Sequence, residues 1–168
     1  INIDTRQLIS DKFIAFIEET LQQYSWLAQL ISFEITEVCK IHDEVKAQAM
    51  LAKLRQYGFS ISIDDFGTGF AAMQYLIKYP IDVLKIERLF ITDILQDTKK
   101  QVIVKSVIEM AHSLSMQALA EGVSNREEIE YLRSLGCDLI QGFGFGVPMS
   151  SKDASKWLEG EECYEIIH

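Results

Sequence analysis

The stretch FSISIDD (Phe59–Asp65) decides the fold, because polar and apolar residues alternate along it. Residues two apart on a β-strand share a face, so Ser60, Ser62 and Asp64 are expected on one face and Ile61, Ile63 and Asp65 on the other. We predict a strand that ends in two aspartates and is followed by Phe66 and by the turn residues Gly67, Thr68 and Gly69.

Helical segments flank this strand, and the alternation continues to both ends of the chain. Asp43–Tyr57 precedes it and ends at Gly58, and Ala71–Lys78 follows it and stops before Pro80. The other expected strands are Ile1–Asp4, Leu30–Thr36, Val83–Glu87, Gln117–Val123 and Leu139–Phe143. The other expected helices are Asp11–Tyr24, Gln101–Leu114, Ser124–Leu135, which begins with Ser124 and Glu127 in capping-box spacing, and Ala154–Leu158.

Six strands separated by helices predict an α/β fold with a parallel sheet covered by helices. Both an open doubly wound sheet and a TIM-type (β/α) barrel fit that pattern. A barrel needs about 250 residues and eight strands, so a barrel of this length would be incomplete, with about six βα units. The glycines Gly142, Gly144 and Gly146 are spaced GxGxG, which is not the fingerprint of a dinucleotide-binding fold.

Composition and charge restrict the class of ligand and the compartment. The chain has 168 residues and a net charge of -9, which argues against a DNA or RNA polymer as partner. A small anionic ligand remains compatible, since bound divalent cations can supply positive charge. Cys39, Cys137 and Cys163 form no CxxC pair, and no apolar run approaches 18 residues, so a cytoplasmic location is expected. Because the first residue is Ile1, we expect a longer parent protein, whose upstream region is free to carry a membrane anchor.

A polar or charged group lies at the C-terminal end of each expected strand. These residues are Asn2, Glu34, Asp64 with Asp65, Lys85 with Glu87, Glu121 and Gln141. In a barrel, that end is the active-site face. Converging carboxylates repel one another unless cations lie between them, and oxygen ligands suit Mg²⁺ or Mn²⁺. One of the paired aspartates could bridge two ions about 3.5–4 Å apart, with Lys85 as the fixed cation.

Each of these residues also has a simpler interpretation. A single acid at a strand end is commonly a helix cap or a solvated residue, Asp64–Gly67 could form a plain turn, and Lys85 could extend its ammonium group to solvent from the sheet edge. The histidines His42, His112 and His168 are expected to be solvated or packed. Coincidence on six strands at once favours a metal-dependent site over these separate interpretations.

The same residues resemble the successive signatures of EAL domains, from Ile1 to about Leu158. The matching segments are FEITE (Phe33–Glu37), IDDFGTGF (Ile63–Phe70), LKIE (Leu84–Glu87), AEGV (Ala120–Val123) and LGCDLIQGFGFGVP (Leu135–Pro148). The resemblance implies an EAL domain over residues 1–160, lacking the first strands, and a C-terminal tail over 161–168. It also implies a phosphodiesterase of bacterial signalling that opens cyclic di-GMP to linear pGpG with Mg²⁺ or Mn²⁺ and is inhibited by Ca²⁺.

The resemblance also assigns roles by position. Asn2, Glu34 and Asp64 match the ligands of the first metal, and Asp64, Asp65 and Glu121 match those of the second, which Glu87 adjoins. Lys85 matches the lysine that contacts the hydrolytic water, and Gln141 matches a substrate-side glutamine. Glu37 matches the acid that steadies the loop of Phe66, Gly67, Thr68 and Gly69, which in the family couples the site to dimerisation. A homodimer and an upstream sensor or GGDEF domain are therefore the expected partners, besides cyclic di-GMP.

Three departures from the family pattern support an alternative. The Glu-Ala-Leu motif, which supplies a first-metal ligand, would lie upstream of Ile1. LKIE replaces LKID at Glu87, and EGVS replaces EGVE at Ser124. The alternative is a catalytically degenerate EAL domain that acts as a cyclic di-GMP receptor or a protein-interaction module. We also expect the present fragment alone to have little or no turnover.

Overall fold

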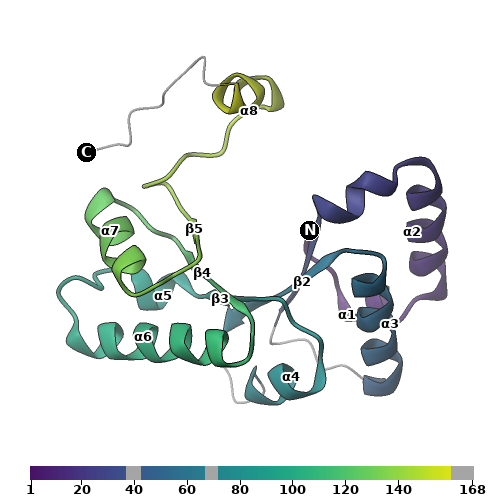
Figure 1. Ribbon diagram of the computed structural model, residues 1–168, viewed down its shortest axis with the longest axis horizontal. Coiled ribbons are helices and arrows are strands. Elements are labelled where there is room, and N and C mark those ends of the chain that lie inside the picture. The colour runs from purple at the N-terminus through teal and green to yellow at the C-terminus, as the bar shows by residue number, and fades with distance from the viewer. Residues whose placement is uncertain (37–42, 67–71, 160–168) are drawn as a thin grey trace. The chain divides into compact units, whose positions relative to one another are not determined.

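The computed structural model describes residues 1–36, 43–66 and 72–159, in which helices and strands alternate (Figure 1). The strands are β1 (Ser32–Thr36), β2 (Ser60–Phe66), β3 (Val83–Ile86), β4 (Gln117–Glu121) and β5 (Leu139–Gln141). The helices are α1 (Thr5–Leu8), α2 (Asp11–Gln23), η1 (Ser25–Gln29), α3 (Glu44–Gln56), α4 (Ala72–Lys78), α5 (Arg88–Ile91), α6 (Thr98–Ser113), α7 (Arg126–Ser134) and α8 (Ser151–Leu158).

The five strands form one sheet in the order β1-β2-β3-β4-β5, with β1–β2 and β4–β5 paired in parallel. An open doubly wound sheet reverses its strand order at a switch point, whereas a barrel keeps the order of the sequence. The sequential order therefore agrees with the barrel. The prediction of a strand at Ile1–Asp4 is wrong, because this segment forms only a single parallel bridge, between Asn2 and Glu34.

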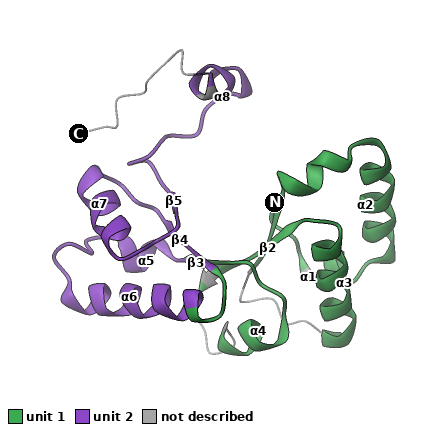
Figure 2. Cartoon of the chain, viewed as in Figure 1, with its two compact units in different colours: residues 1–85, 113–116 green, residues 86–112, 117–168 purple. Residues whose placement is uncertain are grey.

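The chain consists of two compact units (Figure 2). Unit 1 comprises residues 1–85 and 113–116, and unit 2 comprises residues 86–112 and 117–168. Each unit contains strands with predicted polar residues at their C-terminal ends, and the two sets of residues are described separately below.

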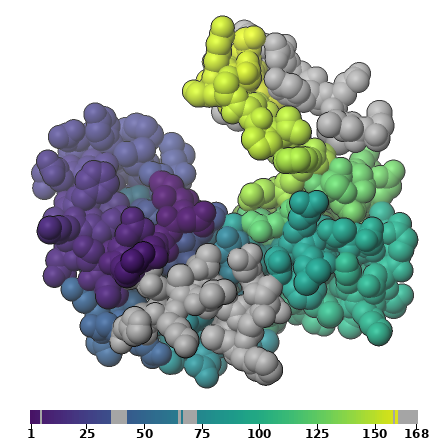
Figure 3. Space-filling model, turned by 180° about the vertical axis from the view of Figure 1, so that it is seen from behind, coloured from purple at the N-terminus to yellow at the C-terminus, as the bar shows by residue number. Residues whose placement is uncertain are grey.

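The core of unit 1 is built on both faces of β2. Ile61 and Ile63 are fully buried, and Ser62 on the other face is 2% exposed, as expected of a parallel strand covered on both sides. Phe33 of β1 packs against Phe59, with ring centroids 5.0 Å apart, and against Phe13 of α2 at 5.8 Å. Figure 3 shows the purple surface that the N-terminal residues of this unit present to solvent.

Two ion pairs fasten α2 to α3 within unit 1. The Lys46 ammonium lies 2.8 Å from Asp11, and the Lys53 ammonium lies 2.7 Å from Glu18. Glu18 also accepts a hydrogen bond from the Tyr57 hydroxyl. The hydrogen bonds from Lys53 and Tyr57 lower the pKa of Glu18. The helix α3 begins at its cap Asp43, as the sequence predicts, and Gly58 follows its last turn.

The core of unit 2 is formed by α6, β4 and α7. Val104, Ile108 and Ala111 of α6 are buried at helical spacing, and Ala118 and Ala120 of β4 are fully buried. Small alanines on β4 allow close packing of its neighbours.

The predicted start of α7 is one residue out of register. The cap is Asn125, whose side chain accepts from the Glu128 N–H at 2.9 Å, and not Ser124 with Glu127. Glu128 instead turns its carboxylate back to Ser124, accepting from the backbone N–H at 2.7 Å and from the hydroxyl at 3.0 Å. Asn125 thus caps the helix, while the Glu128 carboxylate bonds the residue before the cap and not the cap itself, as it would in a capping box.

Candidate functional site

Unit 1 brings together three predicted site residues on neighbouring strands. The Lys85 ammonium lies 3.1 Å from Glu34 Oε2 and 3.0 Å from Asp64 Oδ1. Lys85 is 3% exposed, so its charge is held inside the unit. In the register of β1 and β2, Thr36 lies opposite Asp64 and Glu34 opposite Ser62, which places the two carboxylates two residues apart on the same face. The simpler interpretation, in which Lys85 extends its ammonium group to solvent from the sheet edge, is therefore wrong.

Asp64 has capacity left for a further ligand. Its buried Oδ1 lies 3.0 Å from the Lys85 ammonium but accepts no hydrogen bond from the described residues. Buried carboxylate oxygens normally have partners, and an unsatisfied one requires an explanation. A cation bound beside Asp64 would provide that partner.

The donor chemistry in unit 1 fits a hard divalent cation. Glu34 and Asp64 supply carboxylates, and Asn2, whose backbone is bridged to that of Glu34, is an amide residue beside β1. Within the described ranges, no group of three His, Cys, Asp or Glu side chains is assembled as a metal cage. Mg²⁺ commonly binds through one or two carboxylates, with water and substrate phosphate as its other ligands, so the donors present are of the type it takes.

Part of the predicted site lies outside the described residues. Asp65 lies in β2, but its side chain is not described, and Glu37, Gly67, Thr68 and Gly69 fall in the ranges 37–42 and 67–71. Phe66, the last residue of β2, is 4% exposed, so it packs in the interior of its unit. The predicted coupling of this loop to dimerisation remains a prediction.

Unit 2 carries the other predicted residues at the ends of its strands. Glu121 is the last residue of β4 and lies opposite Gln141, the last residue of β5. Glu87 follows β3 and precedes α5, and its Oε2 is buried and accepts no hydrogen bond from the described part of the chain. Glu87 thus has the same unsatisfied character as Asp64, which agrees with a place beside a cation.

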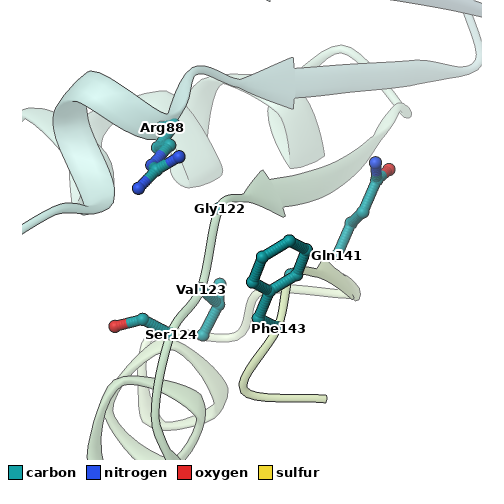
Figure 4. Close-up of a pocket in the computed structure, with 7 residues that line it drawn as sticks. Arg88, Gly122, Val123, Ser124, Gln141 and Phe143 are labelled. Atoms are coloured by element: carbon teal, nitrogen blue, oxygen red, sulfur yellow. The ribbon is translucent and has the colours of Figure 1, made fainter. Parts of the chain in front are cut away.

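A small pocket of about 200 Å³ opens at this end of β4 and β5 (Figure 4). Its lining comes from the start of α5, the segment after β4 and the end of β5, namely Arg88, Gly122, Val123, Ser124, Gln141, Gly142 and Phe143. Arg88 lies on one side, and Gln141 and Phe143 lie on the other. Arg88 and Glu128 were not predicted from sequence. The signal for Arg88 was its place directly after the LKIE strand.

Glycines make this pocket possible through close backbone approach. A Cβ atom at Gly142 would overlap the Val123 backbone, and one at Gly144 would lie 2.5 Å from the Asn125 nitrogen. Gly122, at φ +69°, lies directly under the Arg88 side chain, where a Cβ would meet its methylene groups. Gly142 and Gly144 of the GxGxG run therefore serve chain packing.

The opposite end of β4 and β5 carries a second polar cluster. Asp138 accepts from the Ala118 N–H at 2.8 Å, and its same oxygen lies 2.8 Å from His112 Nε2. Burial by itself would raise the pKa of Asp138, but the Ala118 N–H and His112 outweigh it and lower the pKa. The Cys137 thiol lies 3.3 Å from the Leu139 carbonyl and 3.5 Å from the Ala118 carbonyl, and burial raises the pKa of this thiol. In a barrel this end serves stability.

Comparison with known proteins identifies the family. The model of the EAL domain matches residues 1–148. The chain belongs to the EAL domain family. The resemblance inferred from sequence is thereby confirmed. Within its described residues, this EAL chain has no helix that is both long and apolar enough to cross a membrane.

Two relatives illustrate the similarity. The EAL chain is 39% identical to the signaling protein YkoW of Bacillus subtilis over 158 residues, which is 94% of the chain and 20% of YkoW. It is 31% identical to the cyclic di-GMP phosphodiesterase PdeR of Escherichia coli over 159 residues, which is 95% of the chain and 24% of PdeR. The chain therefore spans about a fifth to a quarter of the length of these relatives.

Solved structures of EAL proteins confirm the TIM-type fold. The EAL enzyme Bd1971, in its cAMP- and cyclic di-GMP-bound form, matches with a TM-score of 0.86 and 38% identity, over 94% of the EAL chain and 42% of Bd1971. The manganese and cyclic di-GMP complex of BlrP1 from Klebsiella pneumoniae matches with a TM-score of 0.75 and 30% identity, over 85% of the chain and 37% of BlrP1. The parallel sheet described above is thus part of a (β/α) barrel.

Proposed function

We propose that this EAL chain is part of a phosphodiesterase that hydrolyses cyclic di-GMP to linear pGpG with two divalent metal ions. The observation that carries the proposal is the cluster of Glu34, Asp64 and Lys85, in which two carboxylates and a buried ammonium group meet at the active-site end of neighbouring strands. A barrel with a purely structural role has no need of such a cluster, because burying charges is costly.

The choice of ligand is supported by the relatives. PdeR is named a cyclic di-GMP phosphodiesterase, and Bd1971 and BlrP1 are structures with cyclic di-GMP bound. The net charge of -9 is compatible with a ligand that carries two phosphates when bound metal ions supply positive charge. The presence of manganese in the BlrP1 complex is consistent with such a supply of charge.

The metal-holding residues are assigned by their match to the EAL family pattern. Asn2, Glu34 and Asp64 would hold the first ion, and Asp64, Asp65 and Glu121 the second, with Glu87 beside it. The ions would be Mg²⁺ or Mn²⁺, and Ca²⁺ would inhibit. When bound, such ions lower the pKa of a coordinated water and neutralise charge on the phosphate.

The remaining groups would position the reactants. Lys85, fixed by Glu34 and Asp64, would hold the attacking water or a phosphate oxygen by its ammonium group. Gln141 would orient the substrate through its carboxamide. The water oxygen forms a bond to phosphorus, the bond from phosphorus to one ribose 3′ oxygen breaks, and that oxygen takes up a proton. The product is linear pGpG.

A second candidate function is a receptor or interaction module without turnover. It is favoured by Ser124, which stands where the family usually has an acid and which is engaged by Glu128 in a structural contact. Glu87, longer than the family's aspartate, favours it as well. In this case cyclic di-GMP binds but is not cleaved.

Conversion of cyclic di-GMP to pGpG in the presence of Mn²⁺ distinguishes the two functions. We expect turnover from the longer parent protein and little or none from the 168-residue chain. Tight binding by the parent without product at saturating Mn²⁺ would favour the receptor function, and rapid turnover by the chain alone would contradict the need for an upstream glutamate.

An Asp64→Asn change in the parent tests the role of that carboxylate. Because it would ligate both ions, we expect turnover to fall by at least about a hundredfold, the scale on which one electrostatic group contributes. A Lys105→Met change on the exposed surface of α6 serves as the control and should leave the rate unchanged. A normal rate in Asp64→Asn would refute the bridging role.

A homodimer formed through the barrel, and an upstream sensor or GGDEF domain, belong to the same proposal for the parent protein. We also propose a cytoplasmic location for this domain.

A further inference from the structure

The pocket of unit 2 has a positively charged lining, although acidic residues adjoin it in the sequence. Of its lining residues Arg88 is charged, and the other six are neutral. Glu87 and Glu121 precede lining residues in the chain, yet neither contributes to the wall. In a chain with 25 acidic and 16 basic residues, a pocket whose only charge is positive is suited to an anion.

The Arg88 guanidinium is available for a ligand. Among the described residues it forms no ion pair or hydrogen bond, whereas Arg6, Arg55 and Arg126 each lie within 3.0 Å of a carboxylate oxygen. An arginine fork fits phosphate oxygens in a bidentate manner, which a lysine cannot reproduce. The pocket therefore offers donors without an internal acceptor.

Two contacts keep this arrangement in place. The absence of a Cβ at Gly122 lets the Arg88 side chain lie against the backbone after β4, so the methylene groups of the arginine pack against that backbone. Glu128 is 5% exposed, its carboxylate accepts from the N–H and hydroxyl of Ser124, and it is not among the lining residues. A site arranged before binding loses less entropy when the ligand arrives.

The other side of the pocket suits a nucleobase. Phe143 is 65% exposed and presents a ring for stacking, and the Gln141 carboxamide can bond a base edge (Figure 4). The volume of about 200 Å³ is below the roughly 300–1,000 Å³ of a pocket for a whole drug-sized ligand. It would therefore hold one part of a larger ligand.

We infer that this pocket is a subsite for a phosphoryl group of a nucleotide, with Arg88 as its cation. Binding of phosphate follows from the pocket alone, whereas the identity of the nucleotide rests on the proposed function. The phosphoryl group comes either from the terminal phosphate of linear pGpG or from a phosphodiester of cyclic di-GMP.

The first test uses inorganic phosphate and the intact chain. We expect a phosphate titration, followed by NMR of the backbone amides, to shift the signals of Gly122 and Ser124. The shifts should disappear in Arg88→Ala and persist in Arg133→Ala, which removes an exposed arginine of α7 outside the pocket. Arg88→Lys should bind severalfold more weakly, since it keeps the charge and loses the fork. Wild-type phosphate affinity in Arg88→Ala would overturn the inference.

Position 124 supplies an independent test. Ser124→Glu adds a carboxylate to a residue of the lining, and we expect phosphate binding to be lost. Ser124→Ala removes the hydroxyl bond to Glu128 without adding charge, so it should bind phosphate as the wild type does. Equal affinity in both variants would contradict an electrostatic role for this pocket.

Nucleotides distinguish the two sources of the phosphoryl group. If the terminal phosphate is bound, calorimetry should show pGpG binding about tenfold tighter than GpG, the effect of one charged hydrogen bond, and Arg88→Ala should remove that difference. If a phosphodiester is bound, Arg88→Ala should weaken cyclic di-GMP and GpG alike. No change with any nucleotide that the wild type binds would refute the subsite. Phosphate binding that depends on Arg88, together with no binding of cyclic di-GMP or pGpG by the parent protein, would refute the proposed function and leave a phosphate site at Arg88 standing.

Discussion

Lys85 carries a positive charge into the interior of unit 1, where Glu34 and Asp64 balance it. Replacing it in Lys85→Met leaves two carboxylates close together without compensation. Because both retain some contact with water, at 25% and 16% exposure, we expect a loss near the low end for a broken buried pair, about 3 kcal/mol in the free energy of unfolding. Urea titration followed by circular dichroism measures it.

The control is Lys105→Met, in which an exposed lysine loses a 3.9 Å contact with Glu109 on the same helix. It should change the free energy of unfolding by no more than about 0.5 kcal/mol. If a cation site adjoins Glu34 and Asp64, saturating Mn²⁺ should restore stability to Lys85→Met. Equal losses in the two variants would show that the charge of Lys85 is not needed to balance the carboxylates.

At this scale, sequence predicts residue types better than it predicts contacts. The polar residues at the strand ends are readable because each interrupts an apolar run, and Glu34, Asp64 and Lys85 do meet. The burial of Lys85 was not readable, since the depth of a side chain depends on the strands on either side of it. Arg88 and Glu128 were not predicted, because Arg88 packs on Gly122 and Glu128 bonds Ser124. Neither contact can be recognised from the sequence before the chain is folded.

At the scale of elements, the approach of the segment after β5 to the segment after β4 is the most restrictive packing contact. Gly142→Ala and Gly144→Ala each force a Cβ onto backbone atoms of residues 123–125. We expect each to lower the free energy of unfolding by about 1–3 kcal/mol, the usual effect of overpacking. Gly146→Ala is the matched control, because a Cβ there meets nothing within 4 Å. Similar thermal midpoints for all three variants would contradict this packing.

The Asp138 cluster, which joins the end of α6 to β4 and β5, should make stability depend on pH. The pKa of Asp138 is lowered from its usual 3.8 in the folded state, so its contribution is present above that value and is lost as the pH falls through the lower folded pKa. We expect Asp138→Asn to flatten the fall in stability below about pH 4. Urea midpoints between pH 7 and 3 measure this, and Glu109→Gln on the exposed face of α6 should keep the wild-type slope.

The elements with clear periodicity were predicted, and the short ones were not. β2 and α3 follow from alternation and from the cap and glycine at the two ends of the helix. Helices α1 and α5, each four residues long, and η1, of five, carry too few residues for a period to be detected. The segment at Ile1–Asp4 has the composition of a strand, but strand formation needs a ladder of partners, and only Asn2 pairs with Glu34.

For the whole molecule, the proposed metals and ligand should appear as added stability. Mn²⁺ with cyclic di-GMP, each present at a hundred times its dissociation constant, should raise the free energy of unfolding by about 2.7 kcal/mol per site. Calorimetric unfolding measures this, and EDTA should abolish the metal-dependent part. Ca²⁺ should stabilise the protein without supporting turnover in the parent. Unfolding that is insensitive to Mn²⁺ at every concentration would contradict the assigned donors.

The thiol of Cys137 contacts the Ala118 and Leu139 carbonyls, so its rate of chemical modification can report how often β4 and β5 separate. Burial raises the pKa of its thiol, so iodoacetamide alkylates it slowly unless the strands part. With Cys39 and Cys163 changed to serine, the alkylation rate of Cys137 would measure the frequency with which β4 and β5 separate. The same rate, measured with and without nucleotide, would report on ligand binding from the end of the strands opposite the pocket.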